Sequence, residues 1–180
     1  MPRKLNAAGM TLIKSFEGCR LNAYADPGSP LGIELRKPEN MRKTDWQKLS
    51  GSPWTVGWGS TGADFFNLTP DGKPTPIGAE TSWTQEQCDI RKEQDLENVC
   101  SAVESLLKVN VTDNQFAALV SFAYNCGVNN LKHSSLLQLV NSSNPRQAAE
   151  EFAKWTKAQG QVLPGLVKRR EAERRLFLMV

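Results

Sequence analysis

The prolines and glycines of this chain are concentrated in its middle. Most of the ten prolines and thirteen glycines fall between residues 19 and 82, and the stretches on either side carry apolar residues at helical spacing. Turn signals such as DPGSP and PDGKP separate short β-favouring stretches such as WTVGW. We therefore expect one α+β domain, mainly helical. A small β lobe would span residues 19–82, a helical lobe residues 1–18 and 83–180, and a cleft would separate them.

Two helix starts can be read from their capping residues. A helix over residues 6–17 would have Asn6 as its N-cap and Glu17 at its end. A later helix would begin after Thr112, with Gln115 completing a capping box. Further helices are expected from Ser82 or Thr84, over 134–142, over 145–157 and from residue 165 onward. Residues 27–53 are expected to form a long inserted loop with one short helix at MRKTDWQKL.

The charge and hydropathy of the chain limit its partners. The net charge is only +3, whereas a nucleic-acid-binding protein is expected to carry a basic stripe. No apolar run approaches the roughly 20 residues of a membrane span, and the first residues lack the apolar core of a signal peptide. We expect no nucleic-acid partner, no stable membrane insertion and accumulation in the cytoplasm where the protein is made.

The cysteines show no metal-binding pattern. Cys19, Cys88, Cys100 and Cys126 lack the CxxC and Cys/His spacings of metal sites, and His133 is the one histidine. We expect mostly buried, reduced thiols and neither a metal nor a cofactor.

Two carboxylates bracket the stretch FEGCRLNAYAD. Glycoside hydrolysis needs two carboxyl groups in different environments, one protonated and one ionised. Glu17 follows the apolar LIKSF at a helix end, where the helix dipole and burial would favour the protonated form, whereas the nearby Arg20 would favour the ionised form. Asp26 precedes a Pro-Gly turn and should be ionised. The spacing alone is equally that of two surface acids at a bend.

A second stretch, WTVGWGSTG at residues 54–62, adds hydroxyl groups and glycines. Thr55 and Ser60 could hold a water molecule, and the glycines would let a backbone approach closely. An ordinary strand and turn is the alternative interpretation.

Together these segments resemble the active-site region of the phage-type lysozymes, the T4-like and lambdoid endolysins. The pattern of that family is Glu, eight residues, Asp or Cys, five residues, then Thr. Glu17 and Asp26 match in type and spacing, and Thr55 matches by its context. The segments TDNQFAALVSFAYNCG and PGLVKRREAERRLF resemble later helices of the family.

The resemblance implies a lysozyme-like fold and a muramidase that cleaves the β-1,4 bond between N-acetylmuramic acid and N-acetylglucosamine. Glu17 would be the general acid, and Asp26 would orient or activate a water held by Thr55. Inversion would need carboxyl groups ~6.5–9.5 Å apart and retention ~5–5.5 Å, and the sequence does not choose between them. The implied partner is peptidoglycan, which a monomeric enzyme without cofactor would reach after a holin-like pore opens.

The chain departs from the family pattern in two places. Twenty-eight residues, not five, separate Asp26 from Thr55, and Thr44 is an alternative third residue. Ser60 stands where the family usually has histidine. A lytic transglycosylase and a non-catalytic wall-binding module remain alternative functions.

Supporting residues are expected in the later helices. Arg170 falls at the centre of an apolar helix face and needs a carboxylate partner, either the nearby Glu173 or, as we hypothesise, Glu17. Candidate sugar contacts are Asn125, Ser134 and Ser135, although Asn125 could equally be a helix cap. Trp58 could stack on sugar, but a place in the core of the small lobe is favoured.

Overall fold

The computed structural model describes residues 3–25, 29–36, 54–158 and 160–179. Its contacts divide the chain into two compact units, Met1–Phe16 with Asp95–Val180, and Glu17–Gln94. We call the first the helical unit and the second the β unit, and each is described by itself.

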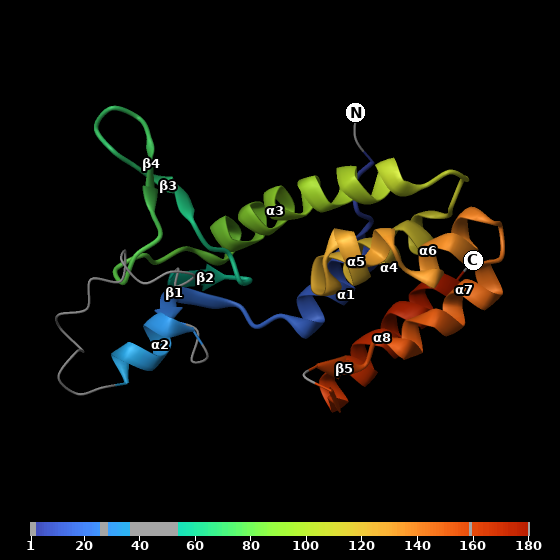
Figure 1. Cartoon of the computed structure of the whole chain (residues 1–180). Coiled ribbons are helices and arrows are strands. Elements are labelled where there is room, and N and C mark those ends of the chain that lie inside the picture. The colour runs from blue at the N-terminus through green and yellow to red at the C-terminus, as the bar shows by residue number, and fades with distance from the viewer. Residues whose placement is uncertain (1–2, 26–28, 37–53, 159, 180) are drawn as a thin grey trace. The chain divides into compact units, whose positions relative to one another are not determined.

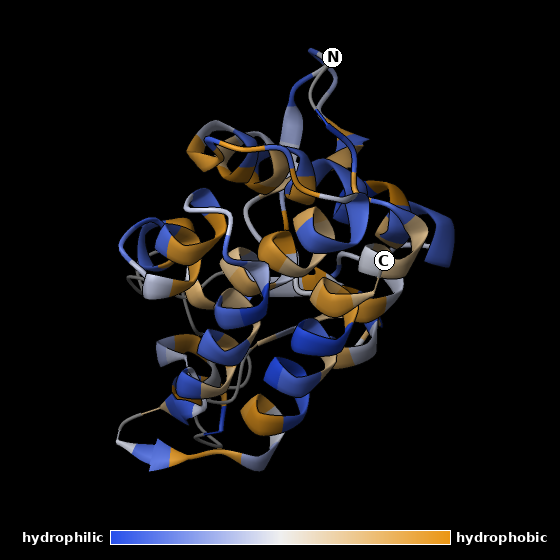
Figure 2. Ribbon diagram, turned by 90° about the vertical axis from the view of Figure 1, so that its right-hand side faces the viewer, coloured by the Kyte–Doolittle hydropathy of each residue, from blue (hydrophilic) through white to orange (hydrophobic). Residues whose placement is uncertain are grey.

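The helical unit is built around one buried helix, α4 (Asp113–Cys126), which packs against α1 (Ala7–Phe16) and α8 (Pro164–Leu178) (Figure 1). All eight residues from Phe116 to Ala123 on α4 are buried. The ribbons of the surrounding helices alternate between hydrophobic and hydrophilic colours, as amphipathic helices do (Figure 2). The remaining elements are α5 (Val128–Lys132), α6 (Ser135–Asn141), α7 (Pro145–Glu151), the 3-10 helix η3 (Phe152–Lys154), β5 (Lys157–Ala158) and β6 (Gln161–Val162).

The capping predictions for α1 and α4 are confirmed. The Gly9 amide donates to Asn6 Oδ1 at 2.9 Å. The Thr112 side chain accepts from the Gln115 amide, and the Gln115 side chain accepts from the Thr112 amide. The end of α1 differs from the prediction, because the helix stops at Phe16 and Glu17 follows it.

Within its described residues, the β unit contains two small antiparallel sheets. β1 (Arg20–Ala25) pairs with β2 (Trp54–Gly57), and β3 (Ala63–Leu68) pairs with β4 (Pro74–Pro76). A separate small core of buried residues lies here, formed by Val56, Ile77, Trp83 and Cys88. The predicted strand within WTVGW is therefore confirmed, and it pairs with the segment that follows Glu17.

The helix α3 (Gln85–Leu106) begins in the β unit and ends in the helical unit. Thr84, not Ser82, precedes it. The Gln87 amide donates to Thr84 Oγ1 and the Thr84 amide donates to Gln87 Oε1, which is a reciprocal capping box.

Two other segments differ from the sequence-based prediction, and a third prediction is not tested. Residues 30–35, expected within a loop, form the helix α2 (Pro30–Leu35), because Ser29 caps it and Pro30 occupies its first turn. The helix expected over 145–157 ends at Glu151 and passes through η3 into β5. The short helix expected at MRKTDWQKL lies outside the described residues.

Among the described helices, none is long and apolar enough to cross a membrane. The same part of the chain holds no group of three or more His, Cys, Asp or Glu side chains that could bind a metal. The cysteines Cys19, Cys88, Cys100 and Cys126 are free thiols, and only Cys88 and Cys100 are buried.

Candidate active site

Strand β1 connects the two segments that carry the predicted carboxylates. Glu17 lies shortly before the strand, and position 26 follows its last residue in sequence. In the register of the sheet, Tyr24 is paired with Thr55 and Arg20 with Gly57. The chain thus returns after the insertion to place Thr55 beside β1. Asp26 and Thr44 themselves lie outside the described residues.

A tight turn after Thr55 lies beside the Glu17 carboxylate. Val56 and Ser60 exchange two backbone hydrogen bonds, at 3.0 and 2.9 Å, which closes the chain on itself over residues 57–59. Gly57 and Gly59 both have positive φ, 64° and 92°. A Cβ atom added to Gly59 would lie 3.9 Å from Glu17 Oε2. A methyl group here would be in ordinary van der Waals contact with the carboxylate, so glycine is favoured by its positive φ and not by lack of space.

The side chain of Trp58 packs against the small core, as predicted, but it is only half-buried there. Its indole nitrogen donates to Asp89 Oδ1 at 2.7 Å, and its backbone oxygen accepts from Lys92 Nζ at 3.1 Å. Both partners lie in the first turns of α3.

Sequence reasoning did not single out Asp89 or Lys92. Lys92 is completely buried although it is charged. It lies four positions before Leu96 and seven before Val99, on the apolar stripe of α3. A charged residue within such a stripe was the available signal.

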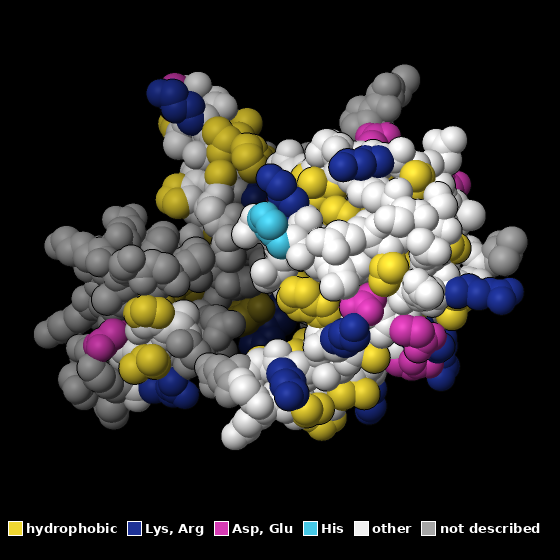
Figure 3. Space-filling model, turned by 45° about the vertical axis from the view of Figure 1, so that its right-hand side comes forward, with side chains coloured by type: hydrophobic (Ala, Val, Ile, Leu, Met, Phe, Trp, Pro, Cys, Tyr) yellow, Lys and Arg dark blue, Asp and Glu magenta, His cyan; other side chains and the backbone are white. Residues whose placement is uncertain are grey.

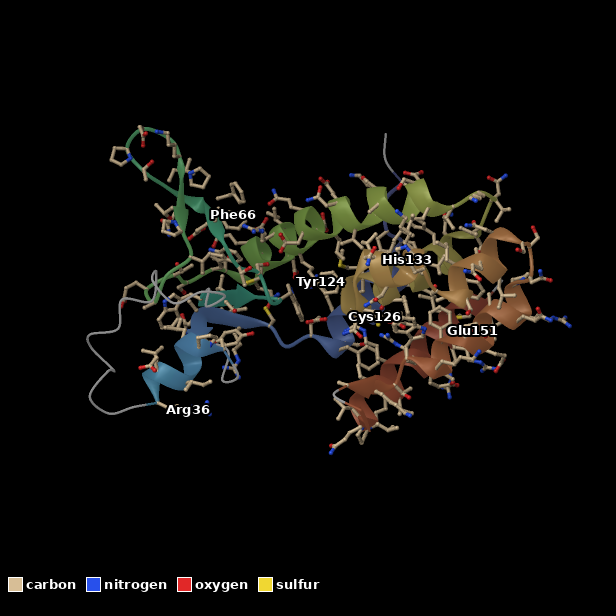
Figure 4. The ribbon with its side chains drawn as sticks, in the orientation of Figure 1. Arg36, Phe66, Tyr124, Cys126, His133 and Glu151 are labelled. Atoms are coloured by element: carbon tan, nitrogen blue, oxygen red, sulfur yellow. The ribbon has the colours of Figure 1, made fainter. Side chains whose placement is uncertain are left out.

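In the helical unit, Arg170 is almost completely buried and its partner on the same helix is Glu173. Arg170 Nε lies 2.8 Å from Glu173 Oε2, and Arg170 Nη2 donates to Asn125 Oδ1 at 2.9 Å. Arg170 Nη1 also contacts the sulfur of Cys126, labelled in Figure 4 at the end of α4. Burial raises the pKa of the Cys126 thiol, and the guanidinium opposes that shift. The alternative contact of Arg170 with Glu17 stays a prediction, because the two residues belong to different units.

The predicted sugar contacts take different local roles. Ser134 is buried and caps α6: its hydroxyl donates to Leu131 O at 2.7 Å and accepts from the Leu137 amide at 3.1 Å. The hydroxyl hydrogen and one of its two lone pairs are therefore used within the protein. Ser135 is exposed at the start of α6, and the exposed Asn125 bonds Arg170. His133 lies on the surface (Figure 3), with Nδ1 2.9 Å from Asn129 O.

Comparison with known proteins identifies the family of the chain. The model of the Phage lysozyme family matches residues 36–173, and the chain belongs to that family. The resemblance seen in the motifs and the mainly helical α+β fold are confirmed. Glu17 and Asp26 precede the matched range, so their assignment depends on the local motif and on likeness over the whole chain.

Three similar proteins illustrate that likeness. The endolysin of Bacillus phage B103 is 40% identical over 174 residues, which are 97% of this chain and 54% of the relative. The muramidase domain of SpmX from Asticaccaulis excentricus is 30% identical, with a TM-score of 0.71 and 99% of both chains covered. A mutant lysozyme of phage P22 is 29% identical, with a TM-score of 0.73 and coverage of 98% of this chain and 99% of that one. The chain spans about half the length of the Bacillus phage endolysins it matches.

Proposed function

We propose that this chain is an endolysin that hydrolyses the β-1,4 bond between N-acetylmuramic acid and N-acetylglucosamine in peptidoglycan. The observation that carries the proposal is the approach of Gly59 to Glu17 Oε2, with Thr55 on the neighbouring strand. Membership of the Phage lysozyme family and the likeness to a muramidase domain support it.

In the proposed reaction, the Glu17 carboxyl group donates its proton to the glycosidic oxygen as the bond from that oxygen to the anomeric carbon breaks. A water molecule then attacks the anomeric carbon and loses a proton to the Asp26 carboxylate. Thr55 would hold this water through its hydroxyl group. The products are two shorter glycan strands, one with a new reducing end.

The partner in this proposal is the glycan strand of the cell wall, which a monomer attacks without a cofactor. The modest positive charge of the chain suits a surface that carries some negative charge. The expectation that the enzyme accumulates in the host cytoplasm until the membrane is opened belongs to the same proposal. Fractionation of producing cells before lysis tests it.

A turbidity assay on cells stripped of their outer membrane tests the activity. Glu17→Gln should reduce the lysis rate at least about a hundredfold, the size expected when a general acid is lost. Asp26→Asn should also reduce it strongly, and Thr55→Val should reduce it less. Asp71→Asn is the matched control, because Asp71 is an exposed acid paired with Lys73 in the same unit.

Product analysis separates the proposed reaction from its alternatives. Reducing ends released from purified peptidoglycan would support hydrolysis, whereas 1,6-anhydro ends would identify a lytic transglycosylase. Binding of peptidoglycan by the wild type without any cleavage would identify a wall-binding module. Full activity of Glu17→Gln would contradict the assignment of the acid.

A further inference from the structure

Three residues near the start of α3 hold the segment Trp58–Ala63 through hydrogen bonds. They are Asp89, Arg91 and Lys92, which lie within about one helical turn. We call them the α3 clamp. Asp89 accepts from the Trp58 indole, and Lys92 donates to the Trp58 backbone oxygen. Arg91 donates to the backbone oxygens of Thr61 and Ala63. The clamp therefore forms hydrogen bonds with the segment that follows β2 at its start, Trp58, and near its end, Thr61 and Ala63.

Stability alone does not account for the burial of Lys92. Its side chain is 0% exposed, and a buried ammonium group needs hydrogen-bond partners to offset lost hydration. The Trp58 oxygen is one of these partners. Replacing buried ionic groups by apolar ones of similar volume is often neutral or stabilising. The presence of lysine on an apolar stripe therefore points to a role other than packing.

The oxygen that Lys92 contacts belongs to the peptide group between Trp58 and Gly59. Gly59 lies beside Glu17, since a Cβ atom added to it would be in van der Waals contact with Oε2 at 3.9 Å. A charge-assisted hydrogen bond to this oxygen restrains the orientation of that peptide group. The backbone beside the carboxylate is thereby held from the side of α3.

We propose that Lys92 is a positioning residue for glycan cleavage: it fixes the Trp58–Gly59 peptide so that the Glu17 carboxyl group keeps its reactive orientation. The proposal rests on the proposed function of Glu17. Small displacements of a reacting group can cost up to about a hundredfold in rate, so the effect should fall on kcat.

The test compares Lys92→Met with Arg91→Met, a matched variant. Each removes a buried cation of the α3 clamp that donates to backbone oxygens of the same segment, but the oxygens bound by Arg91 lie farther along the chain from Gly59. Both are assayed on soluble, uncrosslinked peptidoglycan strands, below their own unfolding temperatures. Lys92→Met should lower kcat at least about tenfold with KM changed less than about twofold, and Arg91→Met should keep kcat within about twofold.

A second variant and a double variant make the test robust to misfolding. Lys92→Gln is shorter, neutral and polar, so it should fold yet fail to reach the Trp58 oxygen, and it should show the same loss of kcat. Gly59→Ala disturbs the same contact between the Trp58–Gly59 peptide and Glu17. The fold-decrease in kcat of the double variant Gly59→Ala/Lys92→Met should therefore be smaller than the product of the two single fold-decreases.

The outcomes distinguish this inference from the proposed function. If the wild type cleaves glycan while both Lys92 variants keep its kcat, or Arg91→Met loses as much, Lys92 has no positioning role and the proposed function stands. A wild type that cleaves no glycan would overturn both.

Discussion

Arg170 Nε lies 2.8 Å from Glu173 Oε2, one turn further along α8, and both side chains are almost completely buried. Arg169 Nε also donates to Glu173 Oε1, at 3.3 Å, and Ser121 donates to the same oxygen at 2.7 Å. One carboxylate therefore balances two buried guanidinium groups in the interior of the helical unit. Arg170 lies on an apolar helix face and needs a carboxylate partner. That partner, Glu173, is on the same helix.

Glu173→Gln should strongly destabilise the protein, because it leaves buried guanidinium groups without their carboxylate. We expect the free energy of unfolding to fall by about 3–5 kcal/mol in urea denaturation. Glu171→Gln on the same helix is the control, since Glu171 pairs with Arg175 at the surface, and it should cost less than about 1 kcal/mol. Equal losses in the two variants would contradict the importance of the buried pair.

Gly9→Ala should destabilise the contact between α1 and α4. A Cβ atom at Gly9 would lie 2.6 Å from the Cβ of Ala117, a separation that requires the helices to move apart. The overpacking should cost about 1–3 kcal/mol, partly offset by the roughly 1 kcal/mol higher helix propensity of alanine. At Gly165, in the first turn of α8, an added Cβ meets no atom within 4 Å. Gly165→Ala should therefore be neutral or slightly stabilising. Thermal unfolding of both variants measures the two effects.

Gly59→Ala should lower activity more than its effect on stability explains. Both Gly59 and Gly62 have positive φ, 92° and 83°, so alanine at either position should cost about 1–3 kcal/mol. Only the methyl group at position 59 would stand near Glu17 Oε2, whereas that at position 62 meets open space. We expect about a tenfold slower lysis for Gly59→Ala than for Gly62→Ala when both are folded. Similar lysis rates would mean that the close approach is not used in the reaction.

Alkaline stability should depend on Cys88. Burial, reinforced by the neighbouring Cys19, raises the pKa of the Cys88 thiol from 9.0 to about 12. Above pH 9 the unfolded chain loses this proton before the folded chain does. The stability contribution is therefore fully present below pH 9 and declines as the pH rises toward 12, by at most about 1.4 kcal/mol per pH unit. Denaturant unfolding between pH 8 and 11 should show a steeper decline for wild type than for Cys88→Ala. Parallel curves would contradict the assignment.

Much of this protein could be predicted from short stretches of sequence, because the signals are local. The capping box of Thr112 and Gln115 depends on side chains three positions apart. The concentration of proline and glycine between residues 19 and 82 interrupts helices wherever it occurs, so the α+β class follows. The order of Glu17 and the glycine-bearing strand after Thr55 was enough to indicate the family.

Other features depended on contacts between residues far apart in the chain. The pairing of Tyr24 with Thr55 across the insertion, and the reach of Lys92 to Trp58, require packing that no local pattern encodes. The sequence by itself indicated the residues that we propose for the chemistry and the caps that begin α1 and α4. Only the tertiary structure decided that the Gly59 backbone lies beside Glu17 and that a lysine is buried behind it. The physical reason is that burial and close approach are properties of the assembled core, in which distant segments must fit one another.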